Sequence, residues 1–167
     1  IFKEELQNSM RNLLPGKILL EFSNDGYEGL DITRIEIYKS ALELIKKNPL
    51  FGIGAGSFTE IFFLNTNFWK GHSHNLLFEL SISYGLPATI IFLITNINIL
   101  YLSSKKIFSS KIKINYIDRA FWTALFFFLI SQLADVQYFD GKISLITWIL
   151  IAGLKNIIMD KDYKTVA

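Results

Sequence analysis

One arginine and two histidines are the side chains of this sequence best suited to do chemistry. Arg34 stands at the first position of a predicted helix, and His72 and His74 lie directly before a long apolar run. A guanidinium group binds phosphate oxygens two at a time. An imidazole hydrogen-bonds phosphate or exchanges a proton near neutral pH. These residue types at a membrane boundary favour a site for a phosphate-bearing headgroup.

Each of these residues also has a purely structural interpretation. Arg34 could be a surface cation paired with Asp31 or Glu36, and His74 could cap the following helix together with Asn75. The histidine pair would need a third ligand to hold zinc. The chain has no cysteine and no HExxH spacing, so the sequence predicts no metal site.

A glycine-rich turn follows the helix that Arg34 opens. It contains Gly52, Gly54 and Gly56, and Ser57 with Glu60 reads as the capping box of the next helix. Backbone amides in such a turn can bind an anion, and the alternative is a tight turn without a ligand. The patterns of nucleotide-binding loops fail here, because the third glycine of the dinucleotide motif and the Gly-Lys-Ser/Thr of the P-loop are missing.

The elements that must position these residues are helices. Thr33 and Glu36 form a capping box, and Asn48-Pro49 ends the helix that they start. An amphipathic helix is predicted within residues 1–30. Residues 1–75 mix polar and apolar side chains, whereas residues 76–167 consist of apolar runs that predict membrane spans at about 76–102, 120–139 and 143–158.

The sequence thus predicts an all-α fold, a polytopic membrane helical bundle preceded by an extracytoplasmic helical loop domain. Gly85 and Pro87 should kink the first span. Basic residues are frequent in the loop after the first span and in the tail but scarce between the second and third spans, which places residues 1–75 outside the cytoplasmic membrane.

We expect the chain to be the carboxy-terminal piece of a longer membrane protein. The net charge of +2 is too small to indicate nucleic acid.

The order of these motifs resembles the O-antigen ligase/polymerase family. That family pattern is an arginine opening a helix, then Pro-x-x-Gly-x-Gly, then His-Asn-x9-Gly-x-x-Gly leading into a membrane helix. Arg34, the segment 48–58 and His74-Asn75 with Gly85 match it in order and spacing, over about residues 33–102. Ala88 departs from the last position, which is often Gly, Thr or Tyr, but its small side chain preserves close packing.

The resemblance implies a metal-independent, inverting glycosyltransferase without a cofactor, in the cytoplasmic (inner) membrane, with its active-site loop on the periplasmic face. The partners would be membrane lipid, a glycan linked to undecaprenyl diphosphate and an acceptor glycolipid or glycan. Arg34 would bind the diphosphate, and His74 would bind the same group or act as base on the acceptor hydroxyl. The supporting groups implied at the site are those of His72, Asn75 and the three glycines.

Glu79 is a further candidate because it lies one turn past Asn75, inside an apolar run. A carboxylate there faces protein or water rather than lipid. We expect it to orient His74, to assist as base or to pair structurally.

Several functions are compatible with these residues. The motif region is shared by O-antigen ligases, surface-polysaccharide polymerases and protein O-oligosaccharyltransferases. A non-enzymatic membrane component of polysaccharide export is a rival, but transporters usually bury ionisable residues midway through spans, and here the unusual residues cluster outside them. A metal-dependent membrane hydrolase is disfavoured by the shortage of ligands.

Overall fold

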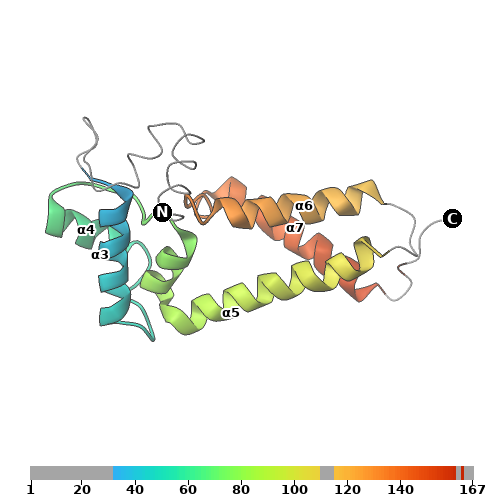
Figure 1. The fold of residues 1–167 in the computed structure, drawn as a ribbon, viewed down its shortest axis with the longest axis horizontal. Helices are drawn as coiled ribbons and strands as arrows, with labels where there is room; N and C mark the ends of the chain where they lie inside the picture. Colours follow the sequence, from blue (N-terminus) through green and yellow to red (C-terminus); the bar gives the residue numbers. More distant parts are fainter. Residues whose placement is uncertain (1–31, 110–114, 161–162, 164–167) are drawn as a thin grey trace, which may run out of the picture.

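The computed structural model describes residues 32–109, 115–160 and 163. The amphipathic helix predicted within residues 1–30 lies outside them. The described residues form helices and no strand, which confirms the all-helical class; the helices are α3 (Arg34–Lys47), α4 (Ser57–Thr66), α5 (Leu76–Ile107), α6 (Tyr116–Ser131) and α7 (Gly141–Met159). In Figure 1, α3, α4 and the start of α5 gather at one end, and the rest of α5 runs beside α6 and α7.

Helix α3 begins and ends where the sequence predicts. The Thr33 hydroxyl accepts a hydrogen bond from the Glu36 amide, and the Glu36 carboxylate accepts one from the Thr33 amide at 2.9 Å, so the predicted capping box is confirmed. Asn48 caps the other end. The apolar side chains of α3 face inward and form a core with side chains of α4 and α5; the members of this core include Ile37, Ala41, Leu44, Ile45, Phe58, Phe62 and Ile82.

The second predicted capping box, from Ser57 to Glu60, is wrong. Gly56 is the N-cap of α4, with φ of 75°, and no side chain caps this end. Ser57 is already the first helical residue, and its hydroxyl donates to the carbonyl of Ile53 at 2.9 Å. A capping serine must be extended at the N-cap position, whereas here the left-handed glycine turns the chain one residue earlier.

Helix α5 is broken at Gly85, as predicted. Gly85 has φ of 85° and ψ of 166°, outside the helical region. The break frees backbone groups, and the segment 49–54 bonds to them: the Ile53 amide donates to the Ile82 carbonyl at 2.7 Å, and the Leu86 amide donates to the Pro49 carbonyl at 2.7 Å. The span predicted over residues 76–102 is therefore divided into a short arm, 76–84, and a long arm, 86–107. The long arm alone measures about 33 Å at 1.5 Å per residue, enough for a hydrocarbon core.

Helix α6 ends earlier than predicted. It stops at Ser131, and residues 132–140 form a loop instead of the last turns of a helix reaching 139. The buried Gln132 causes this, because its side-chain carbonyl accepts hydrogen bonds from the amides of Gln137 and Tyr138 and folds the chain back. Residues 120–134 carry no charged side chain, so the sequence carries no sign that the helix ends at 131. The loop 132–140 lies beside the start of α5.

Two helices of the described residues, α5 and α7, are long and apolar enough to cross a membrane. Helix α6 has 16 residues, fewer than the roughly 20 that a lone span needs, so the third span remains a prediction. Large apolar side chains are exposed along all three helices, among them Ile91, Phe127 and Ile146. Together with the apolar composition, this surface indicates a membrane protein.

Lys106 joins the far ends of α5 and α7. Its ammonium group donates to the backbone carbonyls of Ile157, Ile158 and Asp160, at 3.1, 2.9 and 2.6 Å. These carbonyls belong to the last turn of α7 and the residue after it, where intrahelical partners run out. The lysine therefore completes the helix end and fixes it to α5.

We expect the substitution Lys106→Met to lower the free energy of unfolding by about 2 kcal/mol, because it leaves these carbonyls without a charged donor. Thermal unfolding of the purified protein in detergent measures the change. Lys105→Met is the matched control, since the Lys105 ammonium lies over the exposed ring of Tyr101, and we expect it to change stability by less than about 1 kcal/mol. Equal stability of the two variants would contradict this role for Lys106.

Candidate functional site

The loop 132–140 is held against the start of α5. Asn75 is the N-cap of α5, and its side-chain oxygen accepts from the amides of Leu77 and Phe78 at 2.9 and 3.2 Å. Its side-chain amide donates to the Leu133 carbonyl at 3.0 Å, and the Leu76 amide donates to the Gln132 carbonyl at 2.8 Å. Asn75 thus caps the helix, as the structural interpretation predicts, and also fixes the loop beside His74.

His74 is held in an unusual backbone conformation. Its φ is 53°, in the left-handed region that few residues other than glycine adopt. The ring is 26% exposed, and its Nδ1 lies 3.0 Å from a carboxylate oxygen of Asp135 in the loop 132–140. Because the carboxylate can only accept, Nδ1 carries a proton, and Nε2 of the neutral ring keeps a lone pair.

Burial lowers the pKa of His74 below its ordinary value, and the hydrogen bond to Asp135 partly opposes this; the nearby charges of His72 and Arg34 lower it further. For Asp135, burial alone would raise the pKa, but the bond from His74, the bond from the Val136 amide and the two imidazoles bring it below its usual range. At neutral pH the pair is therefore a neutral imidazole bonded to a carboxylate.

His72 supports this arrangement. Its Nδ1 accepts a hydrogen bond from the His74 backbone amide at 3.2 Å, so its own ring proton resides on Nε2, which lies 3.6 Å from the Asp135 carboxylate. The two imidazole rings meet edge to face with their centroids 4.5 Å apart. His72 thereby helps to hold both the backbone of His74 and the side chain of Asp135.

One nitrogen from each histidine and an Asp135 oxygen lie within 4.8 Å of one another, so Asp135 is a third potential metal ligand beside the two histidines. The tautomer of His72 does not suit a metal, however. Its Nδ1 is engaged by a backbone N–H, which keeps the proton on the nitrogen that would have to coordinate. The three residues therefore fit a hydrogen-bonded triad better than a metal site.

Arg34 reaches the same loop from α3. Its guanidinium Nη1 donates to the Ala134 carbonyl at 2.6 Å, one residue before Asp135. Arg34 and His74 are far apart in the sequence, but they bond to two consecutive residues of this loop, Ala134 and Asp135. The structure therefore brings the predicted guanidinium and imidazole together.

Glu79 is buried next to the residues that surround His74. It is 3% exposed, and its carboxylate accepts a hydrogen bond from the Ser73 amide at 2.9 Å. The carboxylate bonded to the His74 ring is that of Asp135, whereas Glu79 holds the backbone one residue before the histidine. Of the three roles expected for Glu79, its contacts fit the structural pairing.

The glycine-rich turn lies elsewhere. It follows the carboxyl end of α3, whereas Arg34 is the first residue of that helix, and the 14 residues of α3 measure about 21 Å along the helix axis. The Gly52 amide donates to the Asn48 carbonyl and the Gly54 amide to the Ser83 carbonyl, so both are used within the fold. Gly56 caps α4. The structure thus gives these glycines a packing task at the break of α5 and does not bring them to the arginine and histidine.

Asp135 is the site residue that sequence reasoning missed. It stands in the short loop between the second and third predicted spans, 61 positions after His74. The available signal was topological: the loop between the second and third predicted spans was expected on the same side of the membrane as His74, and a carboxylate there is a natural partner for an imidazole.

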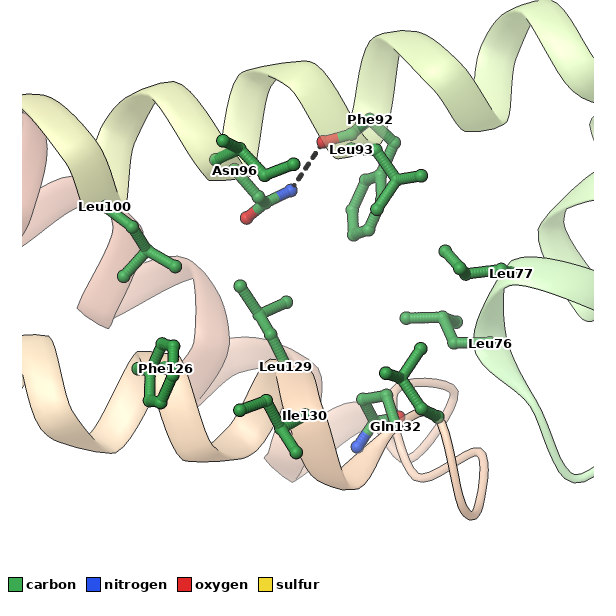
Figure 2. A pocket seen from close by; sticks show the side chains of 12 residues that line it. Leu76, Leu77, Phe92, Leu93, Asn96, Leu100, Phe126, Leu129, Ile130 and Gln132 are labelled. Atoms are coloured by element: carbon green, nitrogen blue, oxygen red, sulfur yellow. Dashed lines mark hydrogen bonds between the residues drawn. The ribbon is translucent and has the colours of Figure 1, made fainter. Parts of the chain in front are cut away.

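An apolar pocket of about 230 Å³ lies beside the cluster, between α5 and α6. Figure 2 shows Leu76 and Leu77 at one end of it and Leu100 and Phe126 at the other. Leu133, whose carbonyl accepts from Asn75, also lines it. The site therefore combines polar groups at the helix ends with an adjoining apolar space of the kind that an amphiphilic molecule could use.

Comparison with known proteins agrees with the sequence motifs. The model of a protein family described as O-antigen ligase matches residues 4–93, more than half of the chain. This range contains α3, the glycine-rich turn, His74 and the break of α5. Neither a curated protein nor a solved structure matches the chain.

Proposed function

The chain belongs to the O-antigen ligase family, and on that premise we propose that it transfers a glycan from undecaprenyl diphosphate to a hydroxyl of an acceptor glycan. The family implies glycan transfer in polysaccharide assembly. The donor, the periplasmic side and a metal-independent, inverting reaction are our proposals. The observation that supports them is that the side chains of Arg34 and His74 both hydrogen-bond to the loop 132–140.

In this proposal the Arg34 guanidinium binds the diphosphate of the donor. Nε2 of His74 takes the proton of the acceptor hydroxyl, whose oxygen attacks the anomeric carbon of the donor sugar as the bond to the diphosphate oxygen breaks. Attack opposite the leaving group inverts the configuration. The Asp135 carboxylate, bonded to Nδ1 of His74, stabilises the imidazolium that forms.

Three features support this assignment of roles. The diphosphate is already a good leaving group, so the reaction needs positioning and charge stabilisation more than acid chemistry. The left-handed backbone of His74 is uncommon for a residue other than glycine, and such conformations are enriched at functional sites. The apolar pocket beside the site suits part of a lipid chain.

The proposal is tested by a transfer assay with the full chain in lipid and a labelled undecaprenyl-diphosphate-linked glycan. We expect Arg34→Ala to lower the rate about 100-fold and Arg34→Lys to restore part of it, because lysine keeps the charge without the two-pronged donor. Arg119→Ala is the control, since Arg119 lies over the Phe108 ring at the far end of α5. Lipid A–core and a second lipid-linked repeat, offered separately as acceptors, distinguish a ligase from a polymerase. Wild-type rates for Arg34→Ala would contradict the proposal.

The pH dependence of transfer follows from the state of His74. A base must be neutral, and burial holds the pKa of His74 below 6.5, so the rate should be constant near neutral pH and fall only as the pH drops through that lowered pKa. Asp135→Asn removes a contribution that raises this pKa, so the acidic fall of the residual activity should move to lower pH. Rates measured from pH 5 to 8 check both statements, and an unmoved or upward-shifted acidic limb in the variant would contradict them.

A further inference from the structure

A small surface that is both apolar and basic lies where the long arm of α5 begins. It consists of Lys46, Lys47, Leu50 and Phe51, which we call the 46–51 surface. We propose that this surface sits in the lipid headgroup region, with Leu50 and Phe51 inserted among the acyl chains of anionic phospholipids. This inference does not depend on the reaction proposed above.

The exposure of the two apolar residues is the first observation. Phe51 is 87% exposed and Leu50 is 62% exposed, although they are neighbours in the same turn. Adjacent large apolar side chains that face outward together indicate an interaction surface rather than a packing accident. An aromatic and an aliphatic side chain at the tip of a turn are suited to the boundary between headgroups and hydrocarbon.

The depth of this turn is fixed by its bond to α5. The Pro49 carbonyl accepts from the Leu86 amide at 2.7 Å, and the Leu50 carbonyl packs directly over Gly85. Leu86 is the first residue of the long arm, and the exposed apolar surface of that arm continues through residues such as Ile90 and Ile91. The turn therefore lies at the level where the long arm, with its exposed apolar side chains, begins.

The charge of the surface selects the lipid. Lys46 and Lys47 form the last turn of α3, and both side chains are exposed. The nearest acid along the described chain is Glu43, one turn earlier. Lysines beside inserted apolar residues attract anionic headgroups, each contributing about 1 kcal/mol near a charged bilayer. An anionic phospholipid surface therefore complements this region better than an uncharged one.

The chain has no cysteine, so one introduced thiol can report its surroundings. The full chain with Phe51→Cys, labelled with bimane, is placed in nanodiscs of phosphatidylcholine and phosphatidylglycerol, and quenching by 5-doxyl lipid is compared with quenching by iodide. Ala55→Cys is the matched control, exposed in the same segment. We expect doxyl lipid to quench the probe at position 51 at least about three-fold more than the probe at position 55, and iodide to do the reverse.

Two results would overturn the inference. Equal iodide quenching at both positions would place the turn in water, and protection of position 51 from both quenchers would show that protein covers it, either another part of the chain or a second copy. Lys46→Glu with Lys47→Glu should halve doxyl quenching in discs containing phosphatidylglycerol and leave it unchanged in phosphatidylcholine alone. An equal response in both lipids would refute the selection of anionic headgroups. Leu50→Cys repeats the measurement if the first variant folds poorly.

Discussion

Replacing His74 by alanine should lower the rate of glycan transfer by about 1,000-fold, because general base catalysis by a positioned side chain contributes roughly 10²–10⁴. The loss should appear in kcat rather than in donor affinity alone, since the acceptor hydroxyl keeps its proton when the imidazole is missing. Single-turnover transfer with a labelled lipid-linked glycan separates these two effects.

His72→Ala is the control for this experiment, because His72 contacts the Asp135 carboxylate and the His74 backbone but has no role as base. We expect it to lower the rate about ten-fold through looser positioning of His74. The two variants change the same kind of side chain within the same short segment. If His72→Ala were the more damaging of the two, our assignment of the base would be wrong.

Gly85→Ala should destabilise the end of the protein formed by α3, α4 and the start of α5. A Cβ at Gly85 would lie 2.1 Å from the Leu50 carbonyl oxygen, and the φ of +85° is strained for alanine in any surroundings. A backbone neighbour cannot move aside as a flexible side chain would. We expect a loss of at least about 4 kcal/mol in the free energy of unfolding, measured by thermal or denaturant unfolding, together with loss of transfer.

Two other glycines separate the causes of this effect. Gly56→Ala meets no atom within 4 Å but has φ of +75°, so it should cost only the backbone strain, about 1 kcal/mol. Gly141→Ala meets no atom and carries no positive φ, so it should have almost no effect. If all three variants were equally stable, the segment 49–54 would not depend on close approach to α5.

Local signals in the sequence were enough to predict much of the fold. The capping box at Thr33 and the stop at Asn48 each depend on residues within a few positions, and both are confirmed. A cap by His74 together with Asn75 was one of two alternatives, and the structure shows Asn75 capping the helix by itself. The break at Gly85 was also predicted, because glycine and proline close together weaken a helix wherever they occur. The capping box at Thr33 also predicted that Arg34 is the first residue of this helix.

Features that depend on distant contacts were not predictable in this way. The end of α6 is set by a buried amide, Gln132, within an apolar stretch. The glycine-rich turn was a candidate anion-binding site, but the amides of Gly52 and Gly54 donate to backbone carbonyls. The acceptor for Gly54 is Ser83, on helix α5 and about thirty positions away. Asp135 meets His74 only because the α6–α7 loop folds back to the start of α5. A single sequence gives no measure of such pairings.

If Arg34 and His74 both serve one lipid-linked diphosphate, equilibrium binding of undecaprenyl diphosphate to the full chain in nanodiscs should depend on Arg34. We expect Arg34→Ala to weaken binding at least about ten-fold. Asp135→Asn should weaken it by less, and Arg119→Ala, at the far end of the bundle, should leave it unchanged. Wild-type affinity for Arg34→Ala, or an equal loss for Arg119→Ala, would show that Arg34 does not bind the diphosphate at this site.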